Sequence, residues 1–229
     1  MHFLLACSGG DNRCLTCEFN MYQFSEHSID ASKSAMQVAV VIPCFHCRYT
    51  IGDVVKAVPD FVSSIICVED CSKDGTKERL YELAKQEPRL TVIGHEHNRG
   101  VGGATISGYR QALELNADII VKLDSDGQMD PAMIAALIEP IVEGEADYTK
   151  GNRFFDLEEV RAMPVLRLIG NAGLSFLTKL STGYWTLFDP TNGFTAIHAN
   201  VAKVLPLDRL HQRYFFESDI LFRLSTLHA

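Results

Sequence analysis

The chain of 229 residues is 47% hydrophobic and 22% charged, and its 21 basic and 29 acidic side chains give a formal net charge of −8 at pH 7. This length and composition fit one α/β domain with a full core. Nucleic-acid binding requires a surface rich in Lys and Arg, and the sequence has no such block, so we do not expect nucleic acid as a partner. No run of 18 or more apolar residues is present, which excludes a transmembrane helix within this chain.

Residues 1–36 differ from the rest of the chain. They begin with a short apolar stretch but are otherwise polar and show no clear period. We interpret them as a disordered extension or as a mis-assigned leader ahead of a true start at Met36. The folded domain is therefore expected over residues 37–229. Its last predicted helix stops at Ala229 without a cap, so we expect this domain to be truncated at its C-terminus.

From residue 37 onward, strand-like and helix-like segments alternate. Apolar, β-branched runs predict four strands, at residues 38–42, 64–68, 90–93 and 118–123. Helical spacing of apolar residues predicts a helix after each strand, at residues 50–58, 74–85, 102–115 and 131–142. Pro131 suits the first turn of the last of these helices. Beyond residue 150 the pattern loosens, and further helices are predicted at residues 165–180 and 215–227.

This alternation predicts an α/β fold, in which a single domain has a Rossmann-like, mostly parallel sheet with helices on both faces. In such sheets, ligands bind at the carboxyl ends of the strands. The segments that follow the first, second and fourth predicted strands carry the residues that stand out chemically, namely Pro43, Phe45, Glu69, Asp70, Asp124, Ser125 and Asp126.

Asp124 and Asp126 follow the fourth predicted strand, separated by one residue. Side chains two positions apart share one side of an extended segment. Two carboxylates at the end of a buried strand are costly unless a positive group binds there. Mg²⁺ or Mn²⁺ bridged to a diphosphate would satisfy both. The alternative is a simple turn before the next helix, with Asp130 as the helix cap.

Two further loops are candidates for contact with a nucleotide. Asp70 can accept hydrogen bonds from a base or a ribose, whereas Asp74 is expected to cap the following helix. Gly100 and Gly102 stand at the start of the third predicted helix, where glycine lets the backbone approach a ligand and the helix N-terminus favours phosphate. The alternative interpretation of these glycines is a flexible loop.

The seven cysteines are odd in number and irregularly spaced, which favours a reducing environment over a secreted disulfide framework. Cys14 and Cys17 form one CxxC pair, and Cys44 and Cys47 form another. A structural zinc site needs four convergent ligands. One pair lies in the leader and the other begins at the end of a strand, so we do not expect zinc.

Five ordered segments resemble the motifs of the family 2 inverting glycosyltransferases of GT-A fold. They are residues 40–45 (VVIPCF), 68–76 (VEDCSKDGT), 98–102 (NRGVG), 123–128 (LDSDGQ) and 151–154 (GNRF). Within that family, the chain is most similar to the branch of dolichyl-phosphate mannose synthase and the polyprenyl-phosphate hexose synthases, because residues 189–194 (DPTNGF) resemble its Asp-x-Thr-Ser-Gly-Phe element. The family usually has Asn at the position of His46 and Asp at the position of Glu69, which leaves the nucleotide preference open. In the polyprenyl branch an arginine often follows the Gly-Phe pair, whereas this chain has Thr195, which leaves recognition of a lipid phosphate open.

The resemblance implies roles for the matched residues. Those expected to bind the nucleotide-sugar are Pro43, Phe45, Asp70, Gly102, Asp124 and Arg153. Those expected to hold a Mg²⁺ or Mn²⁺ cofactor are Asp124 and Asp126. The planar guanidinium of Arg153 suits contact with a phosphate group.

The implied activity is transfer of a hexose, with inversion, from a UDP- or GDP-sugar to a polyprenyl phosphate or a glycan acceptor. A lipid phosphate is already anionic and needs little help from a general base, whereas a sugar hydroxyl needs one. The candidates for that base are Asp219, Asp189 and Glu217. We expect such an enzyme in the cytoplasm, at the inner face of the membrane and in peripheral contact with it, in cell-envelope polysaccharide biosynthesis.

Two other functions stay open at this level. A nucleotidyltransferase that makes a nucleotide-sugar usually has a glycine-rich, basic segment directly after its first strand, where this chain has residues 43–47 (PCFHC). A catalytically silent module that binds a nucleotide-sugar is the other alternative, and it is compatible with a truncated chain.

Overall fold

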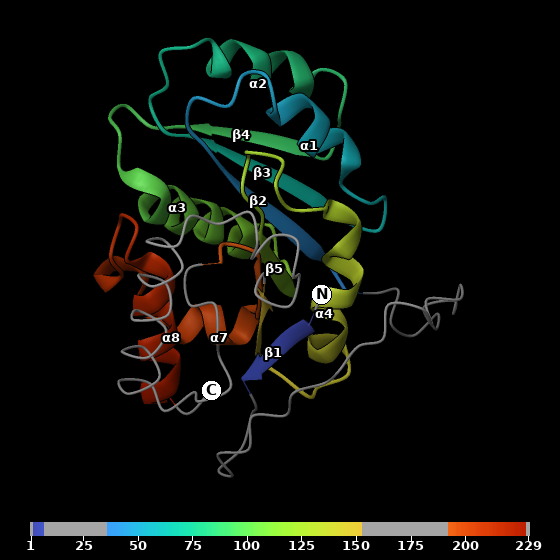
Figure 1. Ribbon diagram of the computed structural model, residues 1–229, viewed down its shortest axis with the longest axis vertical. Helices are drawn as coiled ribbons and strands as arrows, with labels where there is room; N and C mark the ends of the chain where they lie inside the picture. Colours follow the sequence, from blue (N-terminus) through green and yellow to red (C-terminus); the bar gives the residue numbers. More distant parts are fainter. Residues whose placement is uncertain (1, 7–35, 153–191, 228–229) are drawn as a thin grey trace, which may run out of the picture.

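The computed structural model describes residues 2–6, 36–152 and 192–227, which form one α/β domain. Its centre is a seven-stranded sheet in the order β1-β6-β7-β5-β2-β3-β4 (Figure 1). The strands are β1 (His2–Ala6), β2 (Val38–Cys44), β3 (Ser64–Glu69), β4 (Leu90–Gly94), β5 (Ile119–Lys122), β6 (Tyr148–Asn152) and β7 (Thr195–His198).

The four predicted strands form the parallel part of the sheet. β2 pairs in parallel with β3 and with β5, and β3 pairs in parallel with β4. β7 is inserted antiparallel between β5 and β6, and β1 lies antiparallel beside β6. The predicted Rossmann-like, mostly parallel sheet of GT-A type is confirmed, and the antiparallel strands extend it on one side.

β1 falls within residues 1–36, which the sequence analysis placed outside the fold. In the structure His2 pairs with Asn152 and Ala6 pairs with Tyr148, so the strand extends the sheet beyond β6. The expectation is corrected for these five residues, because a five-residue segment is too short to show a period but suffices to pair with an open strand edge. Residues 7–35 lie outside the described part of the chain.

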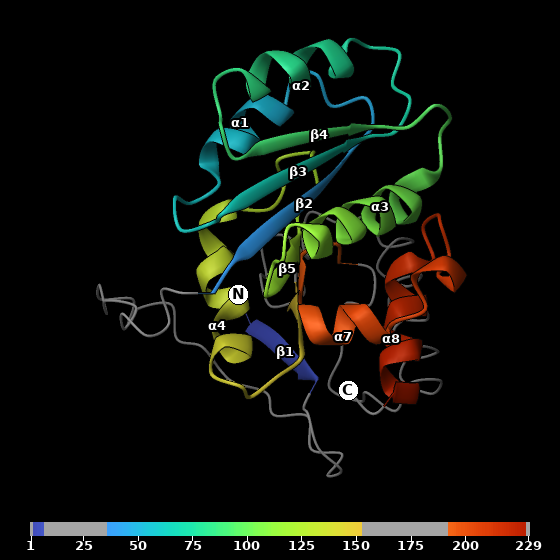
Figure 2. The ribbon, with the colours of Figure 1, turned by 180° about the vertical axis from the view of Figure 1, so that it is seen from behind.

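Helices cover both faces of the sheet, as predicted (Figures 1 and 2). The helices of one face are α1 (Ile51–Ala57), α2 (Thr76–Ala84) and α4 (Ile134–Val142). Those of the other face are α3 (Gly100–Glu114), α7 (Ala199–Val204) and α8 (Phe216–Leu227). Along β2, Val40 and Ile42 enter the first of the two cores while Val41 enters the second, which explains why the strand is apolar without alternation.

Several predicted boundaries shift by one or two residues, and several short elements, β7 and α7 among them, were not predicted. The short 3-10 helix η3 (Pro131–Met133) begins with Asp130 as its cap, since the Asp130 carboxylate accepts from the Ala132 N–H at 3.0 Å, and it leads into α4. β7 and α7 escaped prediction because each has six residues or fewer. The helix predicted at residues 165–180 lies outside the described residues.

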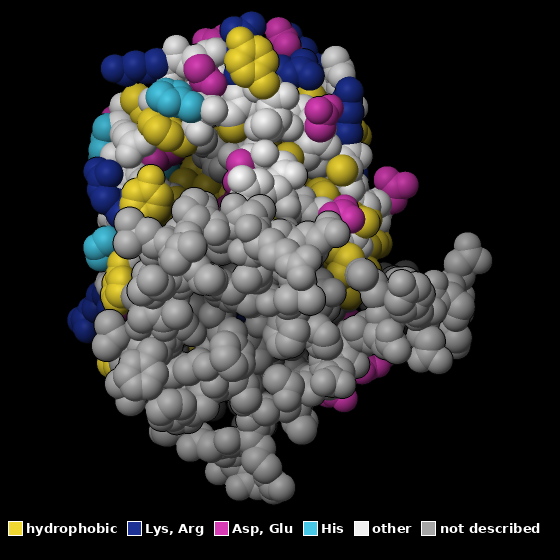
Figure 3. Space-filling model, viewed as in Figure 1, with side chains coloured by type: hydrophobic (Ala, Val, Ile, Leu, Met, Phe, Trp, Pro, Cys, Tyr) yellow, Lys and Arg dark blue, Asp and Glu magenta, His cyan; other side chains and the backbone are white. Residues whose placement is uncertain are grey.

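The surface of the described part agrees with the composition. On the part of this face in Figure 3 that is not covered by undescribed residues, basic and acidic side chains are interspersed. None of the helices in residues 36–152 and 192–227 is both long and apolar enough to cross a membrane.

Candidate functional site

The carboxyl ends of β2, β3 and β5 lie at one edge of the sheet, because these strands are parallel neighbours (Figure 1). Hydrogen bonds join the loops that follow them. The His46 N–H donates to Ser72 Oγ at 3.1 Å, and Thr50 Oγ1 donates to the Ser125 carbonyl at 2.6 Å. The predicted gathering of the motifs at one sheet edge is confirmed.

At the end of β2, Pro43 and Phe45 occupy different environments. Pro43 is still part of the strand, opposite Val68 of β3, and its side chain is buried. Phe45 follows the strand and is 50% exposed, with its ring stacked on that of His46 at a centroid distance of 4.1 Å. An exposed aromatic ring at this edge can stack on a nucleobase, whereas Pro43 lies beneath the surface.

His46 and Glu69, which depart from the family pattern, have local structural roles. His46 has a φ of 51°, in the left-handed region that Asn adopts most readily and that His also tolerates. Glu69 is buried, and its Oε1 accepts from the Ser72 N–H at 2.5 Å. The side chain of Glu69 thus stabilises the turn at residues 70–72 that follows it.

Asp70 is buried, and its carboxylate is engaged by the protein itself. Oδ1 lies 2.8 Å from His95 Nδ1 and accepts from the Arg99 N–H at 2.8 Å, while Oδ2 accepts from the Gly100 N–H at 2.8 Å. These N–H groups belong to the first turn of α3, where the helix has no backbone acceptors of its own. In this structure Asp70 anchors the start of α3, and its expected contact with a nucleoside stays a prediction.

Close packing explains the glycines of α3. A Cβ at Gly102 would lie 2.4 Å from the His211 carbonyl oxygen, and the Gly103 N–H donates to the Gln212 carbonyl at 2.8 Å. Gly100 has a φ of +82°. The backbone before α8 fills the space where a Cβ of Gly102 would stand, and the expected contact of Gly102 with a ligand stays a prediction.

Asp124, Ser125 and Asp126 lie on a turn, because β5 ends at Lys122 and Gly127 has a φ of 76°. The expectation of an extended segment there is wrong. The Asp124 side chain is 31% exposed. Asp126 is exposed, and its Oδ1 accepts from the Gln128 N–H at 3.0 Å.

Lys122, which we did not single out from the sequence, carries the positive charge that pairs with Asp124. Its side chain is 1% exposed, and its ammonium lies 2.6 Å from Asp124 Oδ1 and 3.3 Å from Glu217 Oε1. Burial alone would lower the pKa of Lys122, but the two carboxylates raise that pKa above its ordinary value, so the ammonium stays protonated. The sequence does contain a sign of this buried ion pair, because Lys122 is a charged residue inside the apolar run of residues 119–123.

A second buried lysine supports the same region. Lys122 and Lys150 both lie opposite Thr195, one on each side of β7. Lys122 donates to the Gly193 carbonyl at 3.3 Å, and Lys150 donates to the Asn192 carbonyl. Lys122 thus holds the segment before β7 against Asp124, and Lys150 holds the same segment from the side of β6.

Two of the three candidate bases are described, and both are engaged. Glu217 forms the ion pair with Lys122. Asp219 accepts from the His211 N–H at 2.8 Å and from Arg223 Nε at 3.1 Å. The third candidate, Asp189, and the phosphate-binding candidate Arg153 lie outside the described residues.

The thiols of Cys44, Cys47 and Cys67 are buried and free. Hydrogen bonding to Cys44, together with Ser125, outweighs burial and lowers the pKa of Cys47 to about 7. In the described part of the chain, no three or more His, Cys, Asp or Glu side chains are grouped as metal ligands.

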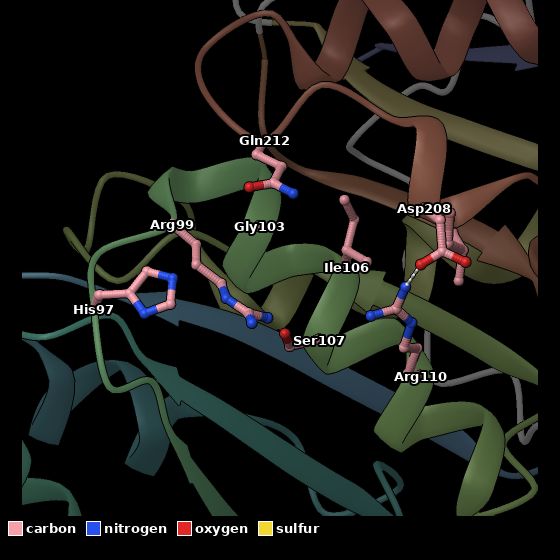
Figure 4. A pocket seen from close by; sticks show the side chains of 9 residues that line it. His97, Arg99, Gly103, Ile106, Ser107, Arg110, Asp208 and Gln212 are labelled. Carbon is pink, nitrogen blue, oxygen red and sulfur yellow. Dashed lines mark hydrogen bonds and ion pairs between the residues drawn. The ribbon is translucent and has the colours of Figure 1, made fainter.

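A separate pocket of about 310 Å³ lies beside α3, without Asp124 or Asp126 in its lining (Figure 4). The α3 residues Gly103, Ile106, Ser107 and Arg110 form one wall, and Arg110 is ion-paired with Asp208. The pocket is lined largely by polar groups, and of its two arginines, Arg99 and Arg110, the second is paired with Asp208.

The GT-A sheet with an Asp-x-Asp turn at its strand ends defines a nucleotide-sugar-dependent glycosyltransferase. Comparison with known families supports this class, since the glycosyl transferase family 2 matches residues 39–205. The chain belongs to this family and is a glycosyltransferase.

Relatives of known activity agree with this assignment. The chain is 36% identical over 190 residues to UDP-N-acetylglucosamine--dolichyl-phosphate N-acetylglucosaminyltransferase of Methanococcus voltae, covering 77% of this chain and 75% of the relative. It is 29% identical over 197 residues to undecaprenyl-phosphate mannosyltransferase of Micrococcus luteus, covering 84% and 79%. The structure of glucosyl-3-phosphoglycerate synthase from Mycobacterium tuberculosis with UDP has a TM-score of 0.67 and 20% identity, covering 91% of this chain and 72% of that one, which shows the shared fold.

Proposed function

We propose that this glycosyltransferase transfers a hexose, with inversion, from a UDP- or GDP-sugar to a polyprenyl phosphate. The observation that carries the choice of acceptor is the engagement of Glu217 and Asp219, the two candidate bases among the described residues, since each carboxylate is already held by a cation. An ion-paired carboxylate is a weak base, whereas a phosphate acceptor arrives as an anion and needs none. The acceptors named for the two relatives are also lipid phosphates.

In this proposal the donor binds across the loops after β2, β3 and β5. The exposed ring of Phe45 would stack on the base, and Asp124 and Asp126 would hold a Mg²⁺ or Mn²⁺ ion together with the diphosphate. Carboxylate oxygens at a partly exposed turn suit such a hard cation. When bound, it would offset the negative charge that develops on the leaving diphosphate. Structures of the M. tuberculosis synthase contain Mn²⁺ or Mg²⁺ with UDP.

The remaining proposed roles concern positioning. Asp70 fixes the N-terminus of α3 behind the donor, while Pro43 and Gly102 let the strand end and the helix pack closely. Arg153 would contact a phosphate. A lipid acceptor requires the enzyme to meet the membrane surface, so we propose peripheral membrane contact from the cytoplasmic side.

The test is turnover with purified protein and Mn²⁺. UDP-N-acetylglucosamine, UDP-glucose and GDP-mannose are each combined with undecaprenyl phosphate, dolichyl phosphate or a glycan acceptor, and release of UDP or GDP is measured. We expect transfer to a lipid phosphate, with the product's anomeric configuration inverted relative to the donor by NMR. Transfer to glycan alone would contradict the acceptor. Release of pyrophosphate from a nucleoside triphosphate would instead identify a nucleotidyltransferase. Metal-dependent binding of the nucleotide-sugar without turnover would identify a catalytically silent binding module.

A further inference from the structure

The Asp124 carboxylate is directed at the protein rather than at solvent alone. Oδ1 lies 2.6 Å from the Lys122 ammonium. Oδ2 faces the backbone of Gly193, where an added Cβ would come within 2.2 Å of it. The carboxylate thus already has a cationic partner before any metal ion binds.

This partner cannot easily leave. The Lys122 side chain is 1% exposed, and its ammonium is also held by Glu217 Oε1 and the Gly193 carbonyl. An ammonium moved away from these groups would remain buried, where an unpaired charge is strongly disfavoured. A divalent cation that binds Asp124 therefore has to share its carboxylate with a fixed positive charge.

Like charges at such short range repel, and the repulsion is stronger in a buried site than in water. A cation that arrives alone meets this repulsion with only the exposed Asp126 as a further carboxylate on the same turn. A cation that arrives with a nucleoside diphosphate brings additional negative charge and oxygen ligands. The repulsion from Lys122 is then offset by the ligand itself.

Building on the proposed metal role of Asp124, we propose that Lys122 is the resting counter-ion of Asp124 and makes cation binding depend on the nucleoside diphosphate. Lys122 is thereby a positioning residue, which acts on the metal site through Asp124. Glu217 partly neutralises Lys122 from the side of α8 and so sets how strongly the free cation is excluded.

Mn²⁺ binding, measured by electron paramagnetic resonance with and without UDP or GDP, tests this proposal. In the intact protein, we expect the diphosphate to tighten Mn²⁺ binding by about tenfold or more, within the usual range of coupling between ligands. Lys122→Met should tighten binding of Mn²⁺ alone by about tenfold or more, because a repulsive charge is gone. A purely structural lysine would give no gain in affinity.

Two further variants separate charge from folding. Glu217→Gln strengthens the net positive field of Lys122 and should weaken binding of Mn²⁺ alone by a few-fold. The double variant Lys122→Met/Glu217→Gln restores the original net charge, and its affinity for Mn²⁺ alone should return to within about threefold of the intact protein. If Lys122→Met does not fold, Glu217→Gln still tests the proposal, because it should weaken the binding of Mn²⁺ alone, and unchanged or tighter binding would contradict the proposal.

The matched control is Arg89→Met. Arg89 is another largely buried cation, bound to Glu87 and to the carbonyls of Pro59 and Val62, and it precedes β4 at the opposite edge of the sheet. Its loss should lower stability without altering Mn²⁺ affinity. Unchanged or weaker binding of Mn²⁺ alone by folded Lys122→Met would overturn the proposal for Lys122, whereas failure of the intact protein to bind Mn²⁺ even with UDP or GDP would overturn the proposed metal role itself.

Discussion

Asp70 and Asp124 both follow strands at the same sheet edge, yet their surroundings differ in kind. Asp70 is buried and bound by two backbone N–H groups and a histidine, all within the protein. Asp124 is 31% exposed and has one strong partner, the Lys122 ammonium. A carboxylate at a strand end is thus available to a ligand only where some of its oxygen lone pairs are not already used by hydrogen bonds or ion pairs within the protein.

Removal of the charge at Asp124 is expected to have the largest effect. Asp124→Asn keeps the shape of the side chain but weakens its hold on a cation, so turnover should fall by about a hundredfold or more, in line with a metal contribution of several kcal/mol. Steady-state kinetics at saturating Mn²⁺ would measure the loss. Asp126→Ala should likewise abolish Mn²⁺-dependent donor binding while thermal unfolding stays unchanged. Unaltered titration of either variant by calorimetry would contradict the metal site.

Asp70→Ala should act on stability instead. It leaves the Arg99 and Gly100 N–H groups without their acceptor, and each unsatisfied buried group costs about 1–3 kcal/mol, so we expect the free energy of unfolding to fall by about 2–4 kcal/mol. Urea denaturation would measure this change. Affinity of the folded fraction for UDP should change by less than about threefold. A large loss of UDP affinity without a loss of stability would restore the nucleoside contact first expected for Asp70.

Gly193→Ala tests how tightly Asp124 and Lys122 are packed. Its Cβ would lie 2.2 Å from Asp124 Oδ2 and 2.5 Å from Lys122 Nζ, so the two charged groups must separate. We expect a cost of about 1–3 kcal/mol in unfolding free energy and a clear loss of turnover. Gly94→Ala is the control, because no atom lies within 4 Å of its added Cβ, and its effect should stay within about 0.5 kcal/mol. Equal behaviour of the two variants would argue against tight packing at Asp124.

Asp219→Asn should have the smallest effect on the chemistry. Its carboxylate is held by the His211 N–H and by Arg223, so we expect turnover with a lipid phosphate acceptor to fall by less than about tenfold. A loss of a hundredfold or more, together with a changed pH dependence of kcat, would instead identify Asp219 as the general base and favour a hydroxyl acceptor.

Much of the fold was predictable because local signals agreed with it. The β-branched run of residues 38–42 and the alternation with amphipathic helices predict a parallel sheet, and Asp130 with Pro131 predicts a capped helix start. β7 and β1 were not predictable, since four or five residues carry no period and their pairing depends on strands far away in the sequence.

The site was predictable in position but only partly in detail. The order of motifs placed Phe45, Asp70 and Asp124 at one sheet edge, and parallel pairing does bring their strand ends together. The engagement of Asp70 and Gly102 by α3 and by the segment before α8 could not be foreseen, because these contacts join residues about 30 to 110 positions apart.

The sequence alone was enough to predict the class of fold, the family and the sheet edge at which we propose that the donor binds, because periodicity and ordered motifs are local properties of the chain. Only the tertiary structure decided which carboxylates are engaged by the protein and which are partly open. Burial and hydrogen-bond partners are set by segments distant in sequence, such as Glu217 on α8 and Gly193 before β7, which meet at Lys122.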